Sequence, residues 1–253
     1  MAKKIQDVSS FYDKETAKYL SDRYQGDNCE HFSYNSRKEI VVDMLQGLSG
    51  SILDVGCGPA IYTEKLLDMG LVPVSVDLSL EMLLEARESL RKKQRDLQWV
   101  RAEIDHLPFI NGAFDNVMAI GVIAYSEDPV SALAELYRVL NSKGILVVQC
   151  TNAISPARAI YNLKDQVLYK VGIRKRPYEF RMNSFNFNRL KRLLEREGFI
   201  VLEKRYYDFR VPFLDRVSTK AAVALMEMFH RLFSKSHFFG WLGQGYIIKT
   251  VKV

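Results

Sequence analysis

The segment Ser51-Ile52-Leu53-Asp54-Val55-Gly56-Cys57-Gly58 has the pattern of a short apolar strand that runs directly into a glycine turn. Residues 62–69 follow it with the pattern of a helix. Glycines at such a turn let the backbone fold tightly and come within contact of a ligand. A strand, a glycine turn and a helix in this order predict the first βαβ unit of a sheet that binds its ligand at the carboxyl ends of its strands.

Short strands and helices continue to alternate as far as residue 150. This alternation predicts right-handed crossovers and a parallel sheet. Two more strands are expected at residues 199–207 and 245–253, the second with alternating Ile, Lys and Val. We therefore expect an α/β fold, a doubly wound, mostly parallel, seven-stranded sheet of the Rossmann-like kind with helical lid insertions.

A second acidic residue, Asp77, ends the next expected strand 19 residues after Gly58. A carboxylate at this place accepts hydrogen bonds from the hydroxyls of a ribose. A dinucleotide would need a third glycine where this chain has Ile61, and its diphosphate would lie beside the like charge of Asp54. S-adenosylmethionine has no phosphate but carries an ammonium and a sulfonium, so Asp54 favours that cofactor.

The same residues resemble those of a known family. Residues 52–59 resemble motif I of class I S-adenosylmethionine-dependent methyltransferases, and residues 74–83, 107–117 and 133–146 resemble later motifs of the quinone-methyltransferase-like branch. The resemblance covers about residues 36–150. It implies a Rossmann-like fold, S-adenosyl-L-methionine as cofactor and methyl transfer as the activity.

The resemblance also implies roles for individual residues. Asp54 would hold the amino group of the cofactor, Arg37 its carboxylate and Asp77 its ribose. Glu103 departs from the family, which commonly has the shorter Asp there, and Ile104 stands where a smaller residue is common. The complete set assigned to the cofactor is Arg37, Asp54, Gly56, Cys57, Gly58, Asp77, Leu78, Met82, Glu103, Ile104, Ile120 and Gly121.

Two residues are candidates to take a proton from an acceptor hydroxyl, His31 in the N-terminal segment and Tyr125 after the fourth strand. Each has an alternative role as a residue that packs in a lid. A base is needed only when the acceptor keeps its proton at pH 7, because alignment alone can supply about 7–11 kcal/mol of the barrier. The four histidines and three cysteines show no metal-binding spacing, so no metal is expected.

Charge divides the chain in two. Residues 1–150 hold 16 Lys and Arg against 22 Asp and Glu, whereas residues 151–253 hold 20 against 8. The basic half fits an acidic acceptor, a nucleic acid or an anionic membrane, and it also fits a merely solvated surface. Its densest basic part is Arg174-Lys175-Arg176, followed by Arg181, which could bind a carboxylate or a phosphate of the acceptor.

The residues after the fourth strand bear on the acceptor. Enzymes that methylate base amino groups have a polar turn there, whereas this chain has Gly121-Val122-Ile123-Ala124-Tyr125. Nucleic acid is therefore disfavoured, and we expect a small-molecule, sugar or lipid-like acceptor that is methylated at oxygen by in-line transfer. Carbon methylation of a quinone or prenyl precursor, RNA methylation and a non-catalytic cofactor-binding scaffold remain the alternatives.

An apolar, partly basic helix is expected from about Ser218 to Phe233. Its stripe fits packing against the body of the protein, and it also fits peripheral contact with a membrane. The sequence has no run of 18 apolar residues and no secretory signal, so we expect a cytoplasmic protein. Its oligomeric state is open.

These observations give one expected domain organisation. A single methyltransferase domain is predicted, in which residues 151–185 show no clear period. Its parts are an N-terminal helical lid (1–48), a cofactor-binding half (49–150) and a substrate-side half (151–253) with insertions at 151–185 and 209–243.

Overall fold

One seven-stranded sheet organises the chain in the computed structural model, which describes residues 2–91, 97–173 and 182–253. The strands lie in the order β3-β2-β1-β4-β5-β7-β6. Their bounds are β1 Ser51–Val55, β2 Val72–Asp77, β3 Gln98–Arg101, β4 Phe114–Ala119, β5 Leu140–Thr151, β6 Phe199–Tyr207 and β7 Gly245–Lys252.

The first five strands are parallel, and β7 lies antiparallel between β5 and β6. The strand order reverses direction next to β1, between β1 and β4, so their carboxyl ends open a crevice at the point where ligands bind in such sheets. The predicted doubly wound, mostly parallel seven-stranded fold is confirmed.

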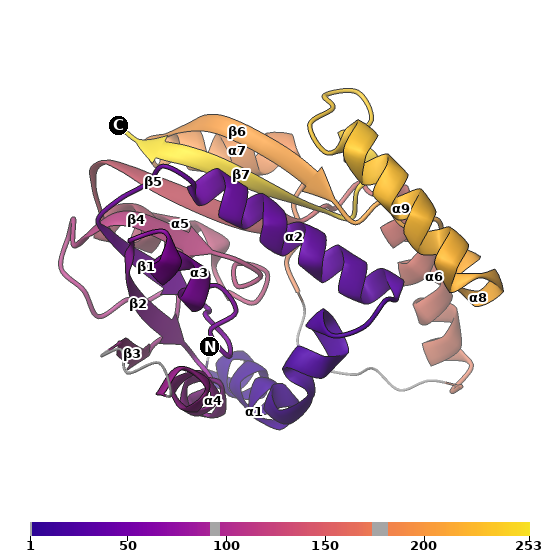
Figure 1. Ribbon diagram of the computed structural model, residues 1–253, viewed down its shortest axis with the longest axis horizontal. Helices are drawn as coiled ribbons and strands as arrows, with labels where there is room; N and C mark the ends of the chain where they lie inside the picture. The colour runs from indigo at the N-terminus through magenta and orange to yellow at the C-terminus, as the bar shows by residue number, and fades with distance from the viewer. Residues whose placement is uncertain (1, 92–96, 174–181) are drawn as a thin grey trace.

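Helices cover both faces of the sheet (Figure 1). They are α1 Ala2–Tyr24, α2 Cys29–Leu45, α3 Thr63–Asp68, α4 Leu80–Arg91, α5 Pro129–Val139, α6 Pro156–Lys170, α7 Phe187–Arg196, α8 Leu214–Val217 and α9 Thr219–Phe233, with a 3-10 turn at Gly240–Leu242. Figure 1 shows α2 in front of the sheet and α5 and α7 behind it.

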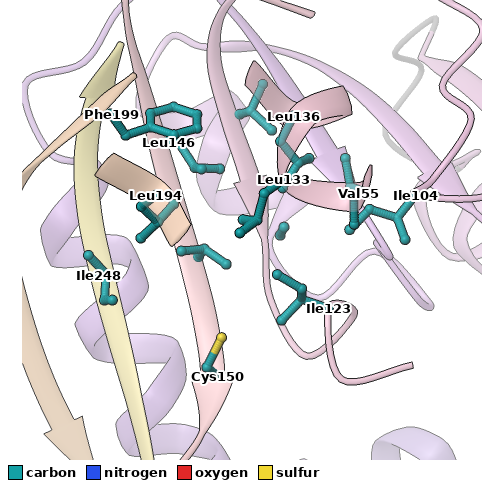
Figure 2. Packing of buried hydrophobic residues seen from close by; sticks show 14 of the residues in the cluster. Val55, Ile104, Ile123, Leu133, Leu136, Leu146, Cys150, Leu194, Phe199 and Ile248 are labelled. Carbon is teal, nitrogen blue, oxygen red and sulfur yellow. The ribbon is translucent and has the colours of Figure 1, made fainter. Parts of the chain in front are cut away.

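Two apolar cores follow from this arrangement. On one face, buried residues of α5 and α7 such as Leu133 and Leu194 pack on β1, β4 and β5, as Figure 2 shows. On the other face, α2 packs through Val41 and Met44 on alternate residues of the same strands. Because the central strands are buried on both faces, they read as continuous apolar runs in the sequence.

Asp115 ties the start of β4 to its neighbours. Its Oδ2 accepts hydrogen bonds from the backbone N of Ser51 at 2.8 Å and from the Ser51 hydroxyl at 3.0 Å. Its Oδ1 accepts one from Asn141 at 2.6 Å. Gly50 turns into β1 with φ +84°, and a Cβ there would lie 2.2 Å from Asp115 Oδ2, so this turn requires glycine.

The two C-terminal insertions differ in how well the sequence predicted them. No clear periodicity was expected in residues 151–185, yet they contain a regular helix, α6. Ala157 is its one buried residue. The helix α9 packs through Ala222 and Met226 onto α2, in line with the packing interpretation of its stripe. The basic residues Arg174, Lys175, Arg176 and Arg181 lie outside the described residues.

We expect Asp115→Ala to lower the free energy of unfolding by about 1.5–3 kcal/mol, because it removes hydrogen bonds to a charged group. The hydrogen bonds from Ser51 lower the pKa of Asp115 below its ordinary value. Its contribution is therefore present at neutral pH and is lost as pH falls through that lowered pKa. Urea unfolding at pH 7 and pH 3 measures both effects, with the exposed Glu85→Ala as control. An equal loss in both variants at pH 7 would contradict this role.

Candidate cofactor and acceptor site

A cavity of about 330 Å³ lies at the carboxyl ends of the parallel strands. Its volume is at the lower end of the range for small-molecule sites. It brings together most of the residues that the sequence predicted for the cofactor and the acceptor. Those that line it are Arg37, Gly56, Gly58, Asp77, Leu78, Met82, Glu103, Ile104, Ile120, Gly121 and Tyr125.

The glycine turn after β1 is held against β2. The backbone N–H groups of Gly56 and Cys57 both donate to the carbonyl of Val76, at 2.8 and 3.0 Å. Gly56 has φ +72°, and a Cβ there would lie 2.7 Å from Val122, so the turn packs closely on the segment after β4. Gly58 also has a positive φ, but a Cβ on it would meet nothing within 4 Å, which leaves open space in front of its backbone.

Asp77 stands at the end of β2 and faces this open space. Its Oδ2 accepts from the backbone N of Gly58 at 2.8 Å, and its Oδ1 accepts from the backbone N of Ser79 at 2.9 Å. Burial raises the pKa of Asp77 above its ordinary value, against these hydrogen bonds. Each carboxylate oxygen has two acceptor lone pairs, so both can accept a further hydrogen bond from a diol.

Asp54 is buried behind the turn and does not line the cavity. Its Oδ2 has no hydrogen-bond partner among the described residues. Burial, with a smaller contribution from the charge of Asp77, raises the pKa of Asp54 to about 7. A buried carboxylate without a counter-charge is costly, so this position favours a cation in the adjacent cavity.

Arg37 of α2 is buried at the opposite wall. Its Nη2 donates to the Tyr24 hydroxyl at 2.8 Å, and its guanidinium lies 4.5 Å from the centre of the Tyr34 ring. A Cβ on Gly121 would lie 3.5 Å from Arg37 Nη1, which places the guanidinium beside the end of β4. Its Nε has no hydrogen-bond partner within the described ranges, so a carboxylate is a fitting ligand for this side chain.

Besides Asp54, two further predicted residues, His31 and Cys57, lie outside the cavity lining. The imidazole of His31 packs under the turn before α2, where a Cβ on Gly26 would lie 2.2 Å from its Nδ1. The prediction that His31 takes a proton therefore has no support from its position. The Cys57 thiol contacts the Gly58 carbonyl at 3.4 Å, and burial raises its pKa well above the ordinary value, so it stays protonated.

Tyr125 does line the cavity, and it packs edge-on against Tyr12 of α1 with ring centres 5.4 Å apart. Burial, followed by the neighbouring Tyr125, raises the pKa of Tyr12 well above its ordinary value. Tyr12 is therefore a neutral phenol and cannot accept a proton at neutral pH. The proposed role of Tyr125 as a base stays a prediction.

The sequence predicted an N-terminal helical lid but not which residues of α1 line the cavity. Tyr12, Tyr19 and Arg23 line the cavity from this helix, and the Arg23 guanidinium lies 4.2 Å from the centre of the Tyr19 ring. The Ser79 hydroxyl, at the start of α4, donates to Asp13 of α1 at 2.5 Å and holds the helix over the site. The signal was present, because positions 12, 19 and 23 fall on one face of a helix.

The residues present fit a sulfonium nucleoside. The paired oxygens of Asp77 suit a ribose, the open space at Gly58 admits a ligand against the backbone, and the unpartnered Asp54 Oδ2 suits an ammonium nearby. Met82 and Ile104 are apolar lining residues near Glu103, as an adenine pocket requires. Fold and site together define a Rossmann-like domain built to bind a positively charged nucleoside.

Comparisons with known proteins identify that domain. Residues 53–148 match the methyltransferase domain family. A malonyl-[acyl-carrier protein] O-methyltransferase of Legionella pneumophila is 41% identical over 101 residues, which cover 38% of this chain and 34% of the relative. A demethylmenaquinone methyltransferase of Renibacterium salmoninarum is 31% identical over 127 residues, covering 49% and 52%. The chain thus spans between about a third and about half of the length of these relatives.

A solved structure is similar over nearly the whole chain. The magnesium protoporphyrin IX methyltransferase of Synechocystis, crystallised with S-adenosylhomocysteine, superposes with a TM-score of 0.67 at 13% identity, covering 97% of this chain and 98% of the other. This likeness shows the fold. The family match identifies residues 53–148 as a methyltransferase domain, and the superposition shows that the chain has the Rossmann-like fold of this S-adenosylmethionine-dependent methyltransferase.

We expect cofactor binding to tighten as pH rises toward 7. Asp54 has a raised pKa of about 7 and must lose its proton when a cation binds nearby, so Kd falls by up to about tenfold per pH unit below pH 7. The amino group of the cofactor stays protonated in this range. Isothermal titration of S-adenosylmethionine between pH 5.5 and 7 measures the slope. The Asp54→Asn variant should show a flatter slope, whereas the exposed Glu85→Gln control should keep the wild-type slope. An unchanged slope in Asp54→Asn would show that Asp54 does not interact with the bound cation.

Asp77→Ala should weaken binding of S-adenosylhomocysteine by about 10- to 100-fold, because it removes the acceptor of the ribose hydrogen bonds. The uncharged sulfur of this ligand separates the ribose contact from the sulfonium charge. Titration calorimetry checks the affinity, and a melting curve checks that the variant folds, since Asp77 also holds the turn. Wild-type affinity in a folded Asp77→Ala protein would rule out the ribose contact.

Proposed function

We propose that this chain transfers the methyl group of S-adenosylmethionine to an oxygen atom of a small-molecule or lipid-like acceptor. The observation that carries the proposal is the extent of the cavity. It runs without interruption from Gly58 and Asp77, on the cofactor side, to residues at the other end of the sheet. On that side it is lined by Thr151 at the end of β5, Tyr207 at the end of β6, Asp208 just after it, and Gln244 just before β7.

The chain's own residues would act mainly by position. The cofactor supplies an activated methyl group for in-line displacement, in which the bond from sulfur to the methyl carbon breaks as the bond from the acceptor oxygen forms. Gly121 and Ile120 lie between the two ends of the cavity and would align the acceptor there. Alignment and exclusion of water can supply a large share of the rate in such a step.

The proton of the acceptor needs a separate account. Tyr12 is held neutral, so it can donate a hydrogen bond but cannot take a proton at pH 7. Tyr125, which contacts it, is the predicted residue that remains in position to orient an acceptor hydroxyl. A carboxylate or phenolate acceptor would need no base at all, because it loses its proton to solvent before the transfer.

The acceptor side of the cavity is lined by both acidic and basic side chains. Arg210 pairs with Asp208 at 2.7 Å, and Glu30 and Arg158 also line this end. Such a lining suits a polar metabolite better than a wholly apolar one. Methylation at oxygen is supported by the name of the Legionella relative, and methylation at carbon by that of the Renibacterium relative.

We expect wild-type protein to transfer radiolabelled methyl groups from S-adenosylmethionine into small molecules of a combined metabolite and lipid extract, insensitive to ribonuclease. Asp77→Ala should abolish the transfer, and the exposed Glu85→Ala should keep it. Heating the product with hydriodic acid releases methyl groups bound to oxygen and leaves those bound to carbon. Retention of the label would establish carbon methylation instead. Cofactor binding without transfer to any fraction would favour a non-catalytic scaffold.

A further inference from the structure

The helix α6 presents its apolar residues to solvent. Ile160, Leu163, Val167 and Val171, which follows the last residue of α6, are spaced three or four residues apart, so they fall on one face. Each is between 42% and 64% exposed. We call these four residues the α6 stripe. A helix on the surface of a globular protein normally turns such a stripe toward the core.

The face of the same helix that is turned toward the protein mixes polar residues with the buried Ala157 and the half-buried Leu168. Arg158 lines the cavity, Lys164 and Asp165 are only 25% and 32% exposed at their side chains, and Tyr161 is half-buried. Lys164 lies 3.5 Å from Asp165 and 5.2 Å from the centre of the Tyr161 ring. Packing among the described residues thus does not account for the apolar outer face.

Neighbouring segments add exposed apolar residues at both sides of α6. The Tyr161 ring contacts Phe213, just before α8, at a centroid distance of 5.8 Å, and α8 ends at Val217, which is 84% exposed. At the start of α6, Ser155 donates to the carbonyl of Leu242 at 3.1 Å. This bond brings the turn of the partly exposed Trp241 to the same helix.

We propose that the α6 stripe docks on the surface of a lipid bilayer that contains anionic headgroups. The exposed charges near the stripe fit such a surface, because basic residues outnumber acidic ones there. Lys170 stands exposed within the stripe's own helix, and Arg216 and Lys220 flank Val217. Aliphatic and aromatic side chains bordered by basic ones bind at the boundary between headgroups and acyl chains.

The binding would be peripheral. No helix within the described residues is long and apolar enough to cross a bilayer. The α6 stripe would insert its side chains only to the depth of the acyl boundary, while the other face of the helix stays against the protein.

A second copy of the chain is a weaker candidate for this face. A stable dimer interface buries about 800 Å² on each partner. Four half-exposed aliphatic side chains along a helix of about four turns supply well below that area. Anionic lipid, in contrast, gains from each basic residue near the surface.

Docking in this way would place the cavity near the lipid, because α6 contributes to both: Arg158 lines the cavity, and the α6 stripe faces the membrane. An acceptor held in the membrane would then reach the site without passing through water. The docking itself does not rest on the proposed methyl transfer, and it is measured without any turnover.

The test uses the full chain and lipid vesicles. Flotation with phosphatidylcholine vesicles is compared with flotation with vesicles that also contain phosphatidylglycerol, an anionic lipid that gives the surface a negative potential. The variant carries Leu163→Ser, Val167→Ser and Val171→Ser, all exposed, so the fold is retained. The matched control carries Val72→Ser, Ile110→Ser and Ile200→Ser, three exposed apolar residues elsewhere on the surface.

We expect wild type and the control to float with the anionic vesicles, and the α6 variant to lose at least about tenfold in partition coefficient. Binding should weaken at high salt. Absence of binding to both vesicle types would overturn the proposal, as would equal binding by the α6 variant. A dimer in light scattering that only the α6 variant breaks, without vesicle binding by wild type, would assign the face to a second copy and overturn it too.

Discussion

Two carboxylates buried at adjacent strand ends, Asp54 and Asp77, are the constraint from which the rest of the site follows. Burial raises the pKa of both, and the charge of Asp77 adds to the raised pKa of Asp54. Asp77 is partly compensated by two backbone N–H groups, whereas Asp54 Oδ2 has no partner among the described residues. A cation in front of them relieves this cost, which is why the site favours a sulfonium nucleoside over a dinucleotide.

The fold places these groups by simple means. The parallel order of β2, β1 and β4 brings their carboxyl ends together, and the turn at Gly56 closes tightly on Val122. The helix α1 then covers the opening, held by the hydrogen bond from Ser79 to Asp13. Because α1 supplies aromatic residues and an arginine to the cavity, the same helix that covers the cofactor also forms one wall of the acceptor space.

The sequence predicted the sheet and the cofactor side well, because there the local signals and the tertiary roles agree. Residues 51–58 have an apolar strand where the strand is buried on both faces, and glycines where the backbone needs a positive φ. The helix α6 was not predicted: Ile160, Leu163 and Val167 do recur at helical spacing, but they face solvent, and the residues turned inward, such as Lys164 and Leu168, mix polar and apolar types. The tyrosines of α1 were missed for another reason: they line the cavity from a helix that is far in sequence from the strand ends that form the rest of the site. His31 was placed by its neighbours in the chain, yet its side chain packs under a turn.

The central claim is that Asp77 and Arg37 hold opposite ends of one sulfur nucleoside in the cavity. A crystal structure with S-adenosylhomocysteine tests it most directly. We predict that both ribose hydroxyls lie within hydrogen-bonding distance of the Asp77 carboxylate and that the ligand carboxylate lies against the Arg37 guanidinium. Density for the ligand elsewhere, or a ribose that leaves Asp77 with only its backbone partners, would contradict the account.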